Sequence, residues 1–180
     1  AGIYSTTFGW VKAMRTSAVL KRLHPGIFTC AGGPYPIALQ ERCLHHCAEF
    51  DAVVTGEGEL TVPELLARLE AGSSLEGVLG VAFRHGDEIV KNPPRPLIED
   101  LDALPFPARE LIDVEPYRRA WRRHGRFSMN LVTTRGCPFH CNWCAKPIWG
   151  QRYNVRSPQN VADEIDEIRR LYGPDHLNFV

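Results

Sequence analysis

The chain has 180 residues, of which 44% are hydrophobic and 23% are charged, which is an ordinary composition for a globular protein. Its 21 Lys and Arg residues balance 21 Asp and Glu residues, and this zero net charge argues against a nucleic-acid binder, which usually carries a basic excess. No apolar run approaches the roughly 20 residues of a membrane span, and Ala1–Arg15 lacks the pattern of a signal peptide.

The N-terminal part alternates between strand-like and helix-like segments. Gly2–Tyr4 has the pattern of a strand end, and the helical pattern that follows places Val11, Met14 and Ala18 on one face. The next apolar run, IFTCAGGPYP, is predicted to be a strand that ends in a tight turn, because two glycines follow it. We expect a helix over ALQERCLHHCAEF, in which Cys43 and Cys47 are interpreted as core residues rather than metal ligands.

A third buried strand is expected in DAVVTGEGE, followed by a helix over TVPELLARLEAG. Thr61 is predicted to be the N-cap of this helix, with Glu64 as its capping-box partner and Gly72 as the C-terminal stop. Alternation of strands and helices is typical of an α/β fold, in which helices cover both faces of a parallel sheet.

From Gly77 onward the pattern changes. GVLGVAFRHGDEIVKN predicts a β-hairpin, and the proline-rich PPRPLIEDLDALPFPARELI resembles a linker laid over a surface. The basic segment YRRAWRRHGRF follows, and we interpret its arginines as a solvated or inter-domain face, with an anionic substrate as the alternative partner. These arginines are Arg118, Arg119, Arg122, Arg123 and Arg126.

The C-terminal part begins with a predicted strand, FSMNLVTTRGC, that runs into a cysteine-rich loop. Ser157 is predicted to cap the next helix, and the acidic run DEIDE at residues 163–167 is interpreted as the polar side of that helix. A strand over HLNFV completes a β-loop-α-β order, as at the start of a second parallel α/β domain. The expected apolar stripe of the helix consists of Val161, Ile165, Ile168 and Tyr172.

These patterns predict three parts: residues 1–75, a hairpin and linker over residues 76–125, and a last part over residues 126–180. The chain lacks an initiator Met, and both of its ends are strand-like. We therefore expect an internal segment of a longer protein, truncated in its first and last domains.

The cysteine-rich loop contains Cys137, Cys141 and Cys144, in the spacing C-x3-C-x2-C. Thiolates are soft ligands that suit zinc, copper(I) or iron–sulfur clusters. Structural zinc requires four ligands, whereas three thiolates on a cubane of four irons leave one iron open to a substrate or cofactor. Six cysteines without a secretion signal also indicate reduced thiols or metal ligands rather than disulfides, and we expect a cytoplasmic location.

Other interpretations of this loop stay open at the level of spacing. A zinc site could be completed by a distant residue, although His140 lies awkwardly between the first two cysteines. Cys141 and Cys144 also form a C-x-x-C redox pattern, which the third cysteine and the preceding strand disfavour.

The run TTRGCPFHCNWCA, after a strand and ahead of a helix, resembles the signature of the radical S-adenosylmethionine family. The resemblance implies a [4Fe–4S] cluster on Cys137, Cys141 and Cys144, with S-adenosylmethionine chelated to the open iron. It also implies reductive cleavage to a 5'-deoxyadenosyl radical, a partial (β/α) barrel of the TIM type, and Trp143 near the adenine.

Residues 1–72 resemble the later part of a flavodoxin-like (Rossmann-like) cobalamin-binding domain. The resemblance rests on three loops that follow successive strands: GIYSTTF, AGGPYP and DAVVTGEGE. Ligands of open parallel sheets bind at the carboxyl ends of the strands. The resemblance implies cobalamin contacts from Ser5, Thr6, Gly32, Gly33, Gly56, Glu57 and Gly58.

Together, the two halves resemble cobalamin-dependent radical S-adenosylmethionine enzymes, most closely the subgroup of the anaerobic magnesium-protoporphyrin IX monomethyl ester cyclase. This implies methyl transfer to carbon or oxidative cyclisation of a small molecule such as a tetrapyrrole or lipid-like compound. A flavodoxin or ferredoxin would supply electrons. The alternatives are a non-catalytic zinc-binding module fused to an α/β ligand-binding domain, and a radical enzyme that no longer binds cobalamin.

Overall fold

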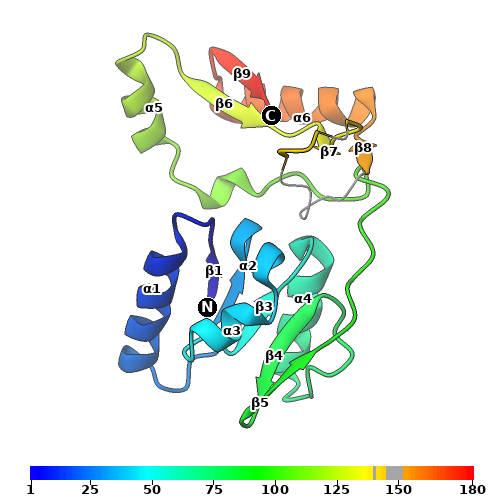
Figure 1. Cartoon of the computed structure of the whole chain (residues 1–180). Coiled ribbons are helices and arrows are strands. Elements are labelled where there is room, and N and C mark those ends of the chain that lie inside the picture. Colours follow the sequence, from blue (N-terminus) through cyan, green and yellow to red (C-terminus); the bar gives the residue numbers. More distant parts are fainter. Residues whose placement is uncertain (140, 145–151) are drawn as a thin grey trace. The chain divides into compact units, whose positions relative to one another are not determined.

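The computed structural model describes residues 1–139, 141–144 and 152–180, and it divides into two compact units, residues 1–98 and 99–180 (Figure 1). Both units are α/β, as the sequence predicts. Within the described part of the chain, no helix combines the length and the apolar character that a membrane crossing needs.

The first unit contains a five-stranded sheet in the order β1-β2-β3-β4-β5. The pairs β1–β2 and β2–β3 are parallel, whereas β4 and β5 form the expected hairpin, which joins the sheet antiparallel to β3. The elements of this unit are β1 (Gly2–Tyr4), α1 (Trp10–Leu23), β2 (Cys30–Gly32), α2 (Pro34–Leu39), α3 (Arg42–His46), β3 (Ala52–Val54), α4 (Gly58–Glu70), β4 (Val81–His85) and β5 (Glu88–Lys91).

Helices cover both faces of this sheet, because successive side chains of the buried strand β3 point to opposite sides (Figure 1). Val53 belongs to the core that includes Trp10 of α1 and Leu44 of α3. Val54 belongs to the core that includes Leu65 of α4. The unit is thus a three-layer α/β/α arrangement whose parallel strands all end at one edge.

The buried face of α1 differs from the predicted one. Val11 is 51% exposed, while Trp10, Ala13 and Ser17 are buried. Ser17 is tolerated in the core because its hydroxyl donates to the Glu49 carbonyl over 3.1 Å.

The single helix predicted over ALQERCLHHCAEF is two short helices, α2 and α3. The break lies at Gln40, a non-glycine residue with a positive φ of 52° whose N–H still caps α2 by donating to the Pro36 carbonyl. The predicted cap at Thr61 is also wrong. Because α4 already begins at Gly58, Thr61 lies inside the helix, fully buried, and its hydroxyl accepts a hydrogen bond from Nε of Arg95.

The second unit has the expected β-loop-α-β order. Strands β6 and β9 are parallel, with α6 between them in sequence, and β7 and β8 form a separate antiparallel pair. Ser157 caps α6 as predicted, since its hydroxyl accepts from the Asn160 N–H over 3.2 Å. The elements are η1 (Arg109–Leu111), α5 (Glu115–Arg122), β6 (Ser128–Leu131), β7 (Thr134–Gly136), β8 (Tyr153–Val155), α6 (Pro158–Tyr172) and β9 (His176–Phe179).

Candidate functional site

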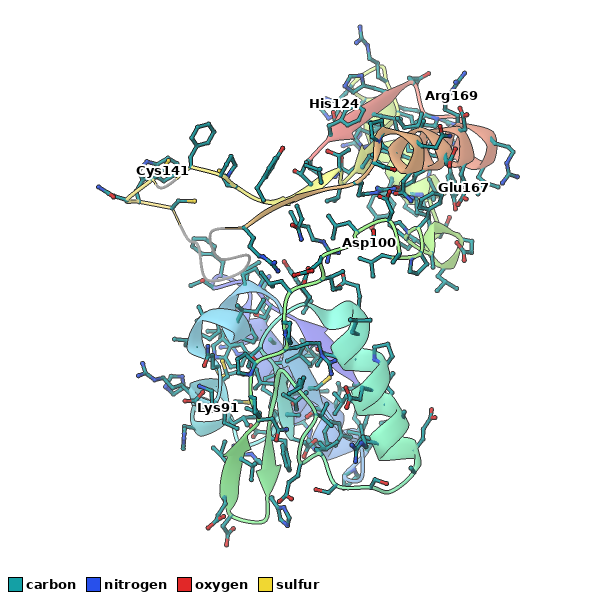
Figure 2. The ribbon with its side chains drawn as sticks, turned by 90° about the vertical axis from the view of Figure 1, so that its right-hand side faces the viewer. Lys91, Asp100, His124, Cys141, Glu167 and Arg169 are labelled. Carbon is teal, nitrogen blue, oxygen red and sulfur yellow. The ribbon has the colours of Figure 1, made fainter. Side chains whose placement is uncertain are left out.

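The cysteine loop is the tip of a β-hairpin. Strands β7 and β8 pair in register from Thr134 opposite Val155 to Gly136 opposite Tyr153. The ladder continues one step further, because the Cys137 N–H donates to the Arg152 carbonyl over 3.1 Å. The loop therefore leaves and re-enters the fold at neighbouring points, and Figure 2 shows Cys141 on the part of it that projects away from α6.

All three candidate ligands are free thiols on this tip, and all three are exposed. Cys141 and Cys144 close a turn, in which the Cys144 N–H donates to the Cys141 carbonyl over 3.3 Å. Trp143 lies between them and is 88% exposed, and Phe139 is 71% exposed. Three thiols and two aromatic rings that no described side chain covers are suited to an external ligand.

The donor set fits an iron–sulfur cluster in its chemistry, since it consists of three soft thiolates on one loop. No three His, Cys, Asp or Glu side chains among the described residues converge on one metal position. A cubane cluster does not need such convergence, because each thiolate binds a different iron. His140, the fourth ligand considered for zinc, lies outside the described residues.

The acidic run at residues 163–167 is not a uniformly polar face, which corrects the sequence interpretation. Glu164 is 1% exposed, and each of its carboxylate oxygens pairs with a different arginine, Arg109 or Arg156. Arg109 and Arg156 lie 55 and 8 positions from Glu164 in the sequence. We call Arg109, Arg156 and Glu164 the base clamp, because Arg156 immediately follows the cysteine hairpin.

The second candidate site lies at the carboxyl edge of β1, β2 and β3. Gly33 has a φ of 101°, and a Cβ there would lie 2.8 Å from both the Ser5 carbonyl oxygen and the Tyr4 ring. Ser5 also donates its N–H to the Gly32 carbonyl over 2.8 Å. The loops after β1 and β2 are thus in contact, and only glycine fits between them.

The predicted cobalamin residues differ in how far they are available to a ligand. Ser5 is 2% exposed and its hydroxyl donates to the Thr6 carbonyl, whereas the Thr6 side chain is exposed. Glu57 is 8% exposed, and its carboxylate accepts from the Ile98 N–H over 2.5 Å. At Gly56 the surroundings are open, since an added Cβ would meet nothing within 4 Å.

Gly58, the remaining predicted residue, is the first residue of α4. The loop of residues 56–58 follows β3, which pairs in parallel with β2, so it lies at the same edge as Gly32 and Gly33. The structure thereby brings the predicted loops to one edge, and the individual ligand contacts remain predictions.

Two aromatic residues at this edge were missed by the sequence interpretation. Tyr4 ends β1 and is 73% exposed, and Phe8 lies in the loop after it and is 98% exposed. The available signal was the position of Tyr4 at the carboxyl end of a parallel strand and of Phe8 in the loop that follows it, where ligands of such sheets bind.

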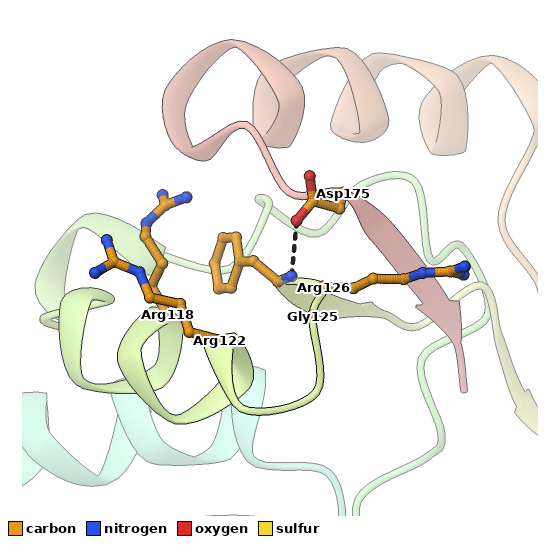
Figure 3. A pocket seen from close by; sticks show the side chains of 6 residues that line it. Arg118, Arg122, Gly125, Arg126 and Asp175 are labelled. Atoms are coloured by element: carbon orange, nitrogen blue, oxygen red, sulfur yellow. Dashed lines mark hydrogen bonds between the residues drawn. The ribbon is translucent and has the colours of Figure 1, made fainter.

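The basic segment borders a pocket of about 300 Å³, lined by Arg118, Arg122, Gly125, Arg126, Phe127 and Asp175 (Figure 3). Phe127 and Asp175 precede β6 and β9, so the pocket lies at the amino ends of these strands. The cysteine hairpin follows the carboxyl end of β6. The pocket is therefore at the opposite end of the strands from the candidate cluster, where an anionic substrate of radical chemistry would not be expected.

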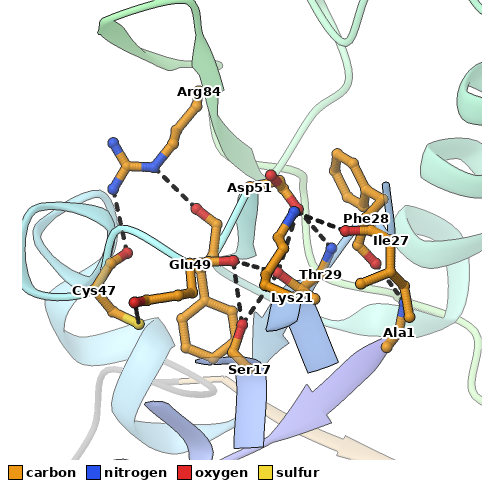
Figure 4. A network of polar contacts seen from close by, with 11 residues as sticks. Ala1, Ser17, Lys21, Ile27, Phe28, Thr29, Cys47, Glu49, Asp51 and Arg84 are labelled. Atoms are coloured by element: carbon orange, nitrogen blue, oxygen red, sulfur yellow. Dashed lines mark hydrogen bonds and ion pairs between the residues drawn. The ribbon is translucent and has the colours of Figure 1, made fainter. Parts of the chain in front are cut away.

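A partly buried polar network at the amino ends of β2 and β3 joins side chains to the backbone of the fold (Figure 4). Asp51 accepts from Nζ of Lys21 at 2.6 Å and from the Thr29 N–H at 2.7 Å.

Cys43 and Cys47 are buried core residues, as predicted. Burial raises the pKa of the Cys43 thiol to about 11, so this thiol is a poor metal ligand at neutral pH.

Comparison with known proteins gives clear relatives. The chain is 32% identical over 180 residues to an uncharacterised methyltransferase of Pyrococcus horikoshii, a match that covers 99% of this chain and 38% of the relative. It is 32% identical over 164 residues to the anaerobic magnesium-protoporphyrin IX monomethyl ester cyclase of Synechocystis, covering 91% of this chain and 32% of that enzyme. No family model matches the chain.

A third relative is a cobalamin-dependent radical SAM methyltransferase of Streptomyces tokunonensis, 29% identical over 164 residues, which are 88% of this chain and 24% of the relative. The chain thus spans well under half the length of these proteins.

Two solved structures share the fold. OxsB, a cobalamin-dependent S-adenosylmethionine radical enzyme solved with aqua-cobalamin and S-adenosylmethionine, has a TM-score of 0.77 at 16% identity, over 99% of this chain and 25% of that one. TsrM of Kitasatospora setae is a radical S-adenosylmethionine methyltransferase solved with cobalamin and a [4Fe-4S] cluster. It has a TM-score of 0.72 at 18% identity, over 99% of this chain and 36% of TsrM.

Proposed function

We propose that this chain is part of a radical S-adenosylmethionine enzyme that also uses cobalamin, because it is similar to a cobalamin-dependent radical SAM methyltransferase and to the anaerobic magnesium-protoporphyrin IX monomethyl ester cyclase. The observation that carries the proposal is the hairpin that presents three exposed thiols on one tip. The position of this hairpin directly after the first strand of the second unit supports the same conclusion.

Cys137, Cys141 and Cys144 would hold a [4Fe–4S] cluster through three of its irons. When bound, the cluster would supply one electron that breaks a C–S bond of S-adenosylmethionine, giving methionine and a 5'-deoxyadenosyl radical. The exposed ring of Trp143, between the last two ligands, would pack near the adenine of S-adenosylmethionine.

Cobalamin would bind at the carboxyl edge of the first sheet. Gly32, Gly33, Gly56 and Gly58 would let the backbone approach the ligand closely, and Thr6 would offer an exposed hydroxyl. Ser5 and Glu57 would support the loops without binding cobalamin directly, because both side chains already form hydrogen bonds with backbone groups. The exposed rings of Tyr4 and Phe8 add apolar surface at the same edge.

The reaction would be methyl transfer to carbon or oxidative cyclisation of a small organic molecule, since the relatives include a protein named as a methyltransferase and one named as a cyclase. A flavodoxin or ferredoxin would be the electron donor. Feeding S-adenosylmethionine with an isotopically labelled methyl group separates the two reactions, since only methyl transfer moves the label into a product.

The proposal is tested with the full-length protein, purified and reconstituted without oxygen. We expect 5'-deoxyadenosine to form from S-adenosylmethionine only when a strong reductant is present, and we expect a corrinoid spectrum after purification. A stoichiometric zinc ion without 5'-deoxyadenosine would favour the zinc-binding module instead. Formation of 5'-deoxyadenosine by protein that binds no added cobalamin would favour the radical enzyme that has lost cobalamin.

A further inference from the structure

We propose that Glu164 is a positioning residue for the candidate cluster: through Arg156 it fixes the base of the cysteine hairpin and thereby the relative positions of the three thiols. This inference rests on the proposed function. Glu164 acts through Arg156 rather than directly on the thiols. It lies on α6, and its carboxylate pairs with the two arginines of the base clamp.

Arg156 ties both ends of the cysteine hairpin together. Its backbone N–H donates to the Thr133 carbonyl over 3.0 Å, just before β7 begins. Its guanidinium donates to the Val132 carbonyl over 2.8 Å. Arg156 directly follows β8, so one residue joins the point where the chain enters the hairpin to the point where it leaves.

Glu164 in turn holds the guanidinium of Arg156 in place. Arg156 also donates through Nε to the Asn160 side chain over 2.6 Å. Asn160 and Glu164, on successive turns of α6, therefore both hold its guanidinium. Arg109 pairs with the other oxygen of Glu164. A guanidinium bound on several sides by charge-assisted hydrogen bonds has little freedom to move.

The base clamp is energetically costly unless all three of its side chains are present. The Glu164 side chain is 1% exposed, and those of Arg109 and Arg156 are 13% and 11% exposed. Charges removed from water in this way are tolerated only when they are paired, and buried ion triads often contribute less stability than apolar side chains would. The clamp is therefore better explained by the geometry it imposes on the hairpin than by stability.

Among its described residues, the hairpin tip is more exposed than its base. Cys137, Cys141 and Cys144 are all exposed, and hydrogen bonds of the β7–β8 ladder and of the turn between Cys141 and Cys144 order the described part of their segment. The relative positions of the three thiols then depend on how firmly β7 and β8 are held at the base of the hairpin. In metal sites, residues that do not bind the metal themselves orient the ligands in the same way.

The test uses the full-length protein with Glu164→Gln, which removes the charge and keeps the shape. After anaerobic reconstitution, we expect the electron paramagnetic resonance titration of the reduced cluster with S-adenosylmethionine to show affinity about ten- to a hundredfold weaker than in the unsubstituted protein. The matched control is Glu167→Gln, the same substitution on the same helix outside the clamp, with affinity changed by no more than about twofold. If Glu164→Gln and Glu167→Gln gave the same spectra and the same affinity for S-adenosylmethionine, the proposal would be overturned.

A second variant separates positioning from folding. In the triple variant Arg109→Met, Arg156→Met and Glu164→Leu, apolar side chains replace the charges, so we expect the urea midpoint to stay close to that of the unsubstituted protein. The spectral response to S-adenosylmethionine should nevertheless weaken as in Glu164→Gln. A triple variant with an unchanged response would contradict a positioning role.

Hydrogen exchange in the unsubstituted protein needs no variant. The N–H groups of Cys137 and Arg156 should exchange as slowly as those in the middle of α6, and fast exchange at both would show that the base is not fixed. Failure of the proposed function is distinguishable, because the unsubstituted protein would then take up no iron while the slow exchange would remain.

Discussion

The ring of Tyr4 lies against Gly33, so closely that a Cβ on Gly33 would come within 2.8 Å of the ring and of the Ser5 carbonyl oxygen. This contact joins the loops that follow β1 and β2. Glycine is suited to this position for two reasons, because it has no Cβ and because the φ of 101° there is nearly restricted to glycine.

Gly33→Ala should therefore destabilise this edge by about 1–3 kcal/mol, through backbone strain and the close contact with Tyr4. Gly56→Ala is the matched control at the same edge, because its new Cβ would meet nothing within 4 Å. Hydrogen exchange of the first unit, measured in the full-length protein at increasing urea concentrations, compares the stability of the two variants. Equal stability of both would contradict the steric account.

Thiol reactivity should separate the cysteines into two groups. Cys137, Cys141 and Cys144 are exposed, while Cys43 is fully buried with a pKa raised to about 11 by burial. At pH 8, iodoacetamide should label the three loop thiols of the iron-free protein and leave Cys43 unmodified, because the thiolate is the reactive form. Mass spectrometry of peptides measures this.

Reconstitution with iron and sulfide should then protect the three loop thiols from the same reagent. Labelling of these thiols at an unchanged rate after reconstitution would argue that they hold no cluster.

Cys141→Ala should abolish cleavage of S-adenosylmethionine, because two thiolates would no longer hold the cluster in place. Corrinoid binding should stay intact, since the candidate cobalamin edge belongs to the first unit. Chromatography for 5'-deoxyadenosine and the visible spectrum of the purified variant give the two readouts. Retained cleavage would be incompatible with the assigned ligand.

Asp102 should contribute a pH-dependent part of the stability of the second unit. Hydrogen bonding by the Ser157 side chain, and next by its backbone N–H at 2.9 Å, lowers the pKa of Asp102. A lowered pKa means that the stabilisation is present above the pKa of about 3.9 in the unfolded chain and is lost as the pH falls through the lower value in the folded chain.

The difference in urea midpoint between the unsubstituted protein and Asp102→Asn should therefore be constant at neutral pH and shrink in acid. A difference that grows as the pH falls would contradict this sign. Glu99→Gln is a suitable control, because the ion pair of Glu99 with Arg152 is exposed.

The sequence predicts those features that depend on neighbours in the chain. The strands β1, β2 and β3, the cap at Ser157 and the placement of three thiols on one loop all follow from local patterns. The glycine pair at the end of β2, Gly32 and Gly33, also predicts the turn that Gly33 makes.

Features that depend on distant partners could not be predicted in this way. Glu164 belongs to an acidic run that looks solvated, and its burial is explained by pairing with Arg156 and with Arg109, which is 55 positions away. Thr61 has the sequence pattern of a cap, yet it is buried inside α4 beneath Arg95. Tertiary pairing overrides local pattern at both positions.

The central claim is that the three loop thiols hold a [4Fe–4S] cluster, and metal analysis tests it most directly. The full-length protein and a variant with Cys137, Cys141 and Cys144 replaced by Ala are reconstituted in parallel without oxygen and analysed for iron, sulfide and zinc. The account predicts about four irons and four sulfides per chain that are lost in the variant. One zinc ion per chain in the unsubstituted protein, with no iron above the level of the variant, would contradict it.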